Sequence, residues 1–174
     1  MDITSYLLGK NASGGGGGSS TIYPYSISFK NNKSETIDLS NVDLSNYGPS
    51  NINDMFRECN NVEELHFNNL TKTLSSATNT FNNCYKLKTA NFDTINLENA
   101  GVINNMQNMF SNCNSLTDDS LNRILLMCTS ATGITGTKAL RLLNVPQALR
   151  ARITNNPENY SNYQAFINAG WTIE

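Results

Sequence analysis

The chain has 174 residues, of which 39% are hydrophobic and 15% are charged, and its net charge is −2. This length fits one domain with a short extension. The weakly negative charge argues against a nucleic-acid-binding protein, because such a protein needs a basic face for phosphates.

Residues 1–10 are expected to form a short helix, with Asp2 near its N-cap. A helix this short does not persist alone in water, yet a disordered tail has no need of several apolar side chains. We therefore predict an anchoring peptide that docks on a partner. The alternative is a peptide that folds back on its own domain or stays disordered. The expected docking side chains are Ile3, Tyr6, Leu7 and Leu8.

Two further segments precede the main domain. Residues 11–20 contain five consecutive glycines followed by two serines, which is typical of a flexible linker. No Lys-Ser or Lys-Thr pair follows the glycines, so a phosphate-binding loop is not indicated. In residues 21–34, Tyr25, Ile27 and Phe29 alternate, which predicts a capping strand for the domain that follows.

A phrase of the form (Met/Thr)-Phe-x-x-Cys-x-x-(Leu/Val) occurs three times between residues 55 and 116. Its cysteines, Cys59, Cys84 and Cys113, are 25 and 29 residues apart. A fixed period of about 20–30 residues is typical of a solenoid, in which one structural unit stacks on the next.

Short strands are expected after these phrases. Apolar residues separated by one position put both side chains on the same face of a strand. One such position recurs at Leu39, Phe67 and Phe92, near Thr117, and at Leu142 and Trp171. The sequence therefore predicts an α/β solenoid of the leucine-rich-repeat type over residues 35–174, with about six rungs and parallel strands on one face.

The last third of the chain is expected to be more helical. Thr117 is the expected N-cap of a helix to about Met127, with Asp118 and Asp119 at its positive end. A strand over residues 138–145, a helix beginning at Pro146 and a last helix ending at about residue 170 should follow. These elements would form the cap that covers the last rung.

The repeated positions should form the core. We expect the three phrase cysteines to stack as buried free thiols; disulfides between rungs and a metal site are the alternatives. The chain has one histidine and no Cys-x-x-Cys pair, so zinc-ligand spacing is absent. The expected core residues are Phe56, Cys59, Leu65, Phe67, Phe81, Cys84, Phe92, Phe110, Cys113, Leu142 and Trp171.

The repeated phrase, together with Phe92-Asp93-Thr94, resembles the BspA-type leucine-rich repeat. The segments 116–122, 134–138 and 163–172 resemble the C-terminal part of certain proteins from bacteriophages and prophages of Gram-positive hosts. The resemblance covers about residues 35–174. It implies a leucine-rich-repeat fold and only suggests a role, since fold does not determine function.

The 29 asparagines allow two interpretations. Asparagine side chains can cap turns in ladders, and asparagine tolerates a left-handed backbone. An AT-rich genome, whose codons favour asparagine, is the alternative.

No set of residues indicates a reaction. His66 should point outward from its strand, Glu63 and Glu64 should lie on a solvated face, and a triad or general-base site is unsupported. We therefore expect no catalytic residue, no cofactor and no metal. The sequence also contains neither an apolar run long enough to span a membrane nor a secretory signal peptide.

These observations favour a non-enzymatic binding module of a phage or prophage particle. It would be made in the host cytoplasm, join a virion component through residues 2–10, and recognise a ligand on the host cell surface. A purely structural or decoration protein of the virion and a bacterial surface adhesin of the BspA type are the alternatives.

Overall fold

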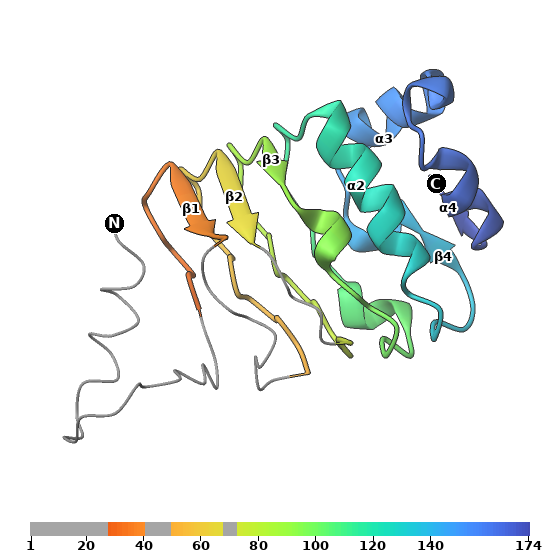
Figure 1. Ribbon diagram of the computed structural model, residues 1–174, viewed down its shortest axis with the longest axis horizontal. Helices are drawn as coiled ribbons and strands as arrows, with labels where there is room; N and C mark the ends of the chain where they lie inside the picture. Colours follow the sequence, from red (N-terminus) through yellow and green to blue (C-terminus); the bar gives the residue numbers. More distant parts are fainter. Residues whose placement is uncertain (1–27, 41–49, 68–72) are drawn as a thin grey trace.

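The computed structural model describes residues 28–40, 50–67 and 73–174. Strands β1 (Thr36–Leu39), β2 (Glu64–Phe67) and β3 (Thr89–Ala90) form one parallel sheet in the order β1-β2-β3. Strands β4 (Lys138–Ala139) and β5 (Trp171–Thr172) form a second parallel sheet. Beyond β3 lie the helices α2 (Asp118–Thr129), α3 (Gln147–Asn155) and α4 (Tyr163–Asn168), as Figure 1 shows. The described ranges also contain four 3₁₀ helices: η1 (Phe92–Thr94), η2 (Ile103–Met106), η3 (Leu140–Leu143) and η4 (Pro157–Asn159).

The prediction of a six-rung leucine-rich-repeat solenoid is wrong. In the described residues the strands belong to two small sheets, of three and two strands, and these are accompanied by three α-helices. Where a fourth strand was expected, the chain enters α2 instead. Thr117 is the N-cap of this helix, and its side chain accepts a hydrogen bond from the backbone N–H of Ser120. The first sheet therefore ends at β3.

The prediction of a strand over residues 138–145 is correct for its first two residues only, and wrong for the rest. After β4 the chain forms the 3₁₀ helix η3, which has three residues per turn. Leu140 and Leu143 therefore point the same way and are buried, whereas Leu142 is only half-buried. Leu143 thus takes the place in the core that was expected for Leu142.

The remaining expected core residues, from Phe56 to Trp171, are all buried. Of the alternating residues expected in a capping strand, only Phe29 lies within the described ranges. It is buried, but residues 28–34 form a turn and irregular chain rather than a strand. The expected helix 1–10, the linker 11–20 and residues 21–27 lie outside the described residues.

The phenylalanines of the repeated phrases stack on one another. The ring centroids of Phe56 and Phe81 lie 5.6 Å apart, and those of Phe81 and Phe110 lie 5.5 Å apart. Phe29 extends the stack from Phe56 at 5.4 Å, and Phe92 meets the rings of Phe81 and Phe110 edge-on. Both geometries are favourable for aromatic pairs, so this stack is a major part of the core.

Left-handed backbone positions recur in each phrase, at the residue before the Met-Phe or Thr-Phe pair and at the residue before the cysteine. Among the described residues, six of the eight non-glycine residues with positive φ are asparagines. Neighbouring amides also bond: Asn112 donates to Asn83 at 2.8 Å, and Asn144 donates to Asn108 at 2.6 Å. Part of the asparagine enrichment therefore has a structural cause. The eight residues are Asn31, Asp54, Glu58, Asn79, Asn83, Asn108, Asn112 and Asn144.

Candidate functional site

The first sheet has one apolar face and one polar face. Ile37, Leu65 and Ala90 are in register with one another and are buried. Because side chains alternate along a strand, the residues directly before and after each buried residue point away from the core. We call these residues the polar sheet face: Thr36, Asp38, Glu64, His66, Thr89 and Asn91.

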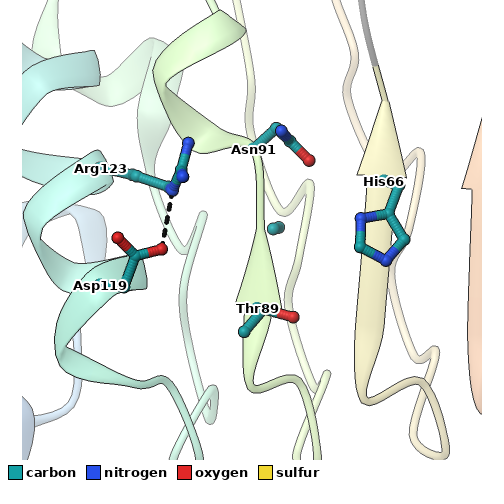
Figure 2. A pocket seen from close by; sticks show the side chains of 6 residues that line it. His66, Thr89, Asn91, Asp119 and Arg123 are labelled. Carbon is teal, nitrogen blue, oxygen red and sulfur yellow. Dashed lines mark hydrogen bonds and ion pairs between the residues drawn. The ribbon is translucent and has the colours of Figure 1, made fainter. Parts of the chain in front are cut away.

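A shallow pocket lies where the polar sheet face meets α2. Its volume is about 140 Å³, and it is lined by His66, Thr89, Ala90, Asn91, Asp119 and Arg123. Figure 2 shows Thr89 and Asn91 between His66 on one side and the Asp119–Arg123 pair on the other. The pocket is thus built from β2, from β3 with the residue that follows it, and from the first turns of α2.

Arg123 is held in place by two carboxylates. Its Nε donates to Asp119 Oδ2 at 2.9 Å, and a terminal nitrogen donates to Asp93 Oδ1 at 2.8 Å. Asp119 lies four residues earlier on the same helix, a spacing that brings the two side chains together. The hydrogen bonds that Arg123 donates to Asp119 and to Asp93, the first being the larger cause, raise the pKa of Arg123 above its ordinary value. The guanidinium therefore forms a fixed, charged wall of the pocket.

His66 points outward from β2, as the sequence predicted. Its Nε2 lies 3.5 Å from Glu64 Oε2, and both side chains are about half exposed, at 44% and 56%. An exposed pair of this kind contributes little to stability. None of the described serines, threonines or cysteines donates a hydrogen bond to the imidazole, so the geometry does not form an activated nucleophile.

Several polar groups of the pocket have unused hydrogen-bonding capacity. Within the described ranges, the Thr89 hydroxyl and the Asn91 side-chain amide have no hydrogen-bond partner. Asp119 uses one of its two oxygens for Arg123, and one terminal nitrogen of Arg123 has no partner among the residues that the structure describes. The pocket therefore presents free donors and free acceptors side by side.

The two neighbouring acids at the start of α2 have separate roles. Asp119 lines the pocket, whereas Asp118 ties α2 to the C-terminal part of the chain. Asp118 Oδ1 accepts a 2.6 Å hydrogen bond from the Tyr160 hydroxyl and pairs with Arg152. The hydrogen bond from Tyr160 lowers the pKa of Asp118, and the interaction with Arg152 lowers it further by a smaller amount. We interpret Asp118 as a structural residue.

The cysteines have no place in this site. Cys59, Cys84, Cys113 and Cys128 are free and buried. The described residues contain no group of three or more histidines, cysteines or acids arranged for a metal ion. The anchor residues Ile3, Tyr6, Leu7 and Leu8 lie outside the part of the chain that the structure describes.

The sequence did not reveal this pocket. His66, Thr89, Asn91 and Asp119 come from three separate segments, and only the register of β2 with β3 and the packing of α2 bring them together. The Asp119–Arg123 spacing was the one local signal, and by itself it predicts only an ordinary helix pair.

Comparisons with known proteins found no matching family, no matching curated protein and no matching solved structure. The resemblance to the BspA-type repeat therefore stays a prediction. In the described ranges, none of the helices is both long and apolar enough to cross a membrane.

Proposed function

We propose that this chain is a non-enzymatic recognition module of a phage or prophage particle, and that it binds its ligand through the polar sheet face. The observation that carries this proposal is the set of unpaired polar groups at the pocket, which lies on a sheet whose other face is fully packed. A rigid sheet keeps such groups in a fixed arrangement, which reduces the entropy lost on binding.

The chemistry of the described residues supports binding rather than catalysis. Burial raises the pKa of the Cys113 thiol to about 12, which leaves almost no thiolate at neutral pH. Among the described residues, the exposed His66 pairs with Glu64, and Asp119 holds Arg123 through one of its oxygens. None of these groups has the partner that an acid–base or nucleophilic mechanism requires.

The assignment to a particle rests on the resemblance of the chain to proteins of Gram-positive phages and prophages. In this proposal Ile3, Tyr6, Leu7 and Leu8 dock on a virion component, and the glycine-rich linker lets the domain present its polar sheet face to the host. The protein would be made in the host cytoplasm and carried in the virion. Particles assembled with a chain that lacks residues 1–18 test the anchor, because the deletion should abolish incorporation while the domain stays folded. Unchanged incorporation would contradict it.

Sedimentation with cell walls of Gram-positive bacteria tests recognition. The purified chain should co-sediment with walls of a susceptible species, and Glu64→Lys on the polar sheet face should abolish this. Glu98→Lys, also at an exposed position but outside the polar sheet face, is the matched control and should bind normally. A chain that enters particles but binds no walls would instead be a structural or decoration protein.

A further inference from the structure

We propose that the pocket between β2, β3 and α2 binds one hydroxyl-bearing sugar unit of a host-surface polysaccharide. This inference rests on the proposed function, since it names the class of ligand that the polar sheet face recognises. The pocket residues that would contact the sugar are Thr89, Asn91, Asp119 and Arg123.

The pocket brings free hydrogen-bond donors and free acceptors together. The Thr89 hydroxyl can donate and accept, the Asn91 amide offers two donors and an acceptor, and Asp119 offers only acceptors. Arg123 offers only donors. A sugar hydroxyl both donates and accepts, so adjacent hydroxyls can satisfy neighbouring donors and acceptors together.

Charged ligands fit this arrangement less well. An anion would face the Asp119 carboxylate, which has a side chain 66% exposed and an unpaired oxygen. A cation would face the positive charge of Arg123, whose guanidinium is held at the pocket by two carboxylates. An apolar ligand would find only Ala90, itself 5% exposed, among the lining residues. A neutral, hydroxyl-rich group avoids all three conflicts.

The size of the pocket favours one unit of a longer chain. Its 140 Å³ is well below the roughly 300–1,000 Å³ of sites that enclose a drug-sized ligand. The polar sheet face continues from the pocket across Glu64 to Asp38 and Thr36 on β1. The remaining units of a polysaccharide would therefore lie along exposed polar side chains.

Amide chemical-shift mapping on the ¹⁵N-labelled full chain tests the proposal. The probes are glucose, galactose, rhamnose, N-acetylglucosamine and N-acetylgalactosamine, each titrated to high millimolar concentration, with lysine and inorganic phosphate as charged probes. At least one sugar should shift the amides of residues 66, 89–91 and 119–123. Thr89→Val and Asn91→Ala should each weaken its binding by about tenfold, because each removes hydrogen bonds to the ligand.

Thr36→Val is the matched control. Thr36 and Thr89 occupy equivalent positions on either side of Glu64 in the sheet, but Thr36 does not line the pocket. This substitution should leave the affinity for the monosaccharide unchanged. The proposal is overturned if no sugar shifts the pocket amides, if lysine or phosphate shifts them instead, or if all three variants bind alike.

Competition separates this inference from the proposed function: the sugar that shifts the pocket amides is added in excess during sedimentation with cell walls. The excess sugar should prevent the chain from binding to the walls. If the walls still bind in excess sugar, and if Glu64→Lys still abolishes that binding, recognition stands and the saccharide assignment fails. If untreated walls of every species tested fail to bind while a sugar shifts the pocket amides, the sugar site stands and host-surface recognition fails.

Discussion

The Cys84 thiol donates a hydrogen bond to the carbonyl oxygen of Phe56, 3.1 Å away and 28 residues earlier in the chain. Cys59 and Cys113 do the same to the carbonyl oxygens of Phe29 and Phe81, at 3.1 and 3.0 Å. Buried carbonyl groups need a partner, and a cysteine is small and apolar enough to provide one inside an aromatic core. The repeated cysteine therefore joins each phrase to the preceding segment.

The thiols should resist alkylation in the native state. All of them are buried, which keeps the reagent away from them, and burial holds the pKa of Cys113 near 12, so this thiol forms little reactive thiolate at neutral pH. Iodoacetamide should label the folded chain slowly and the urea-unfolded chain rapidly, with mass spectrometry reporting each site. Rapid native labelling of Cys59, Cys84 and Cys113 together would contradict the packing described.

Phe81→Ala should lower the free energy of unfolding by about 3–5 kcal/mol, because it removes the central ring of the aromatic stack. Tyr85→Ala is the control. Tyr85 is 44% exposed, so its loss should change stability by less than about 0.5 kcal/mol. Urea unfolding measures both. Equal effects of the two substitutions would show that the stack is not a core.

The C-terminal half illustrates what the sequence could and could not predict. The start of α2 was predictable, because Thr117 followed by two acids is a strong local signal for a helix N-terminus. The prediction of a solenoid was extrapolated from the nearly equal spacing of apolar strand positions along the chain. The same spacing predicted a strand near Thr117. In the structure the local capping signal prevails over the spacing.

Burial of the phrase residues followed from their recurrence, but Leu142 did not obey the strand pattern because its segment is a 3₁₀ helix. Such a short helix has a weak sequence signal. The pocket could not be predicted from the sequence for a different reason. Thr89 and Arg123 become neighbours only through tertiary packing, which no local pattern encodes.

Asp118 should make stability depend on pH. The Tyr160 hydrogen bond, and after it Arg152, lower its folded-state pKa below the unfolded value of about 3.9. Its contribution is therefore fully present above that unfolded value and is lost as the pH falls through the lower folded-state value. The stability difference between wild type and Asp118→Asn should be constant near neutral pH and shrink under acid.

Urea unfolding at a series of pH values measures this difference. Tyr160→Phe removes the hydroxyl that is the larger cause of the shift. It should therefore show part of the same pH dependence. If the stability difference between wild type and Asp118→Asn grew under acid, its sign would contradict a carboxylate stabilised by Tyr160 and Arg152.

Glu58→Asn should stabilise the chain. Glu58 has a φ of 62°, a left-handed conformation that disfavours most side chains, and asparagine occupies the equivalent positions at Asn83 and Asn112. The substitution gives up the half-buried pair of Glu58 with Arg57, whose side chains are still about one third exposed, so that solvent screens their attraction. We expect a gain on the order of 0.5 kcal/mol, measured by thermal or urea unfolding. A loss of similar size would show that the Arg57 pair outweighs the backbone preference.

Site-specific photocrosslinking tests most directly whether the polar sheet face is the recognition surface. A benzoylphenylalanine is placed at Thr36, an exposed position beside Glu64 on this face, and in a second variant at Tyr85, an exposed aromatic position outside it. After irradiation with bound cell walls, the Thr36 variant should become covalently attached to wall material and the Tyr85 variant should not. Attachment from Tyr85 alone, or equally from both positions, would contradict the account.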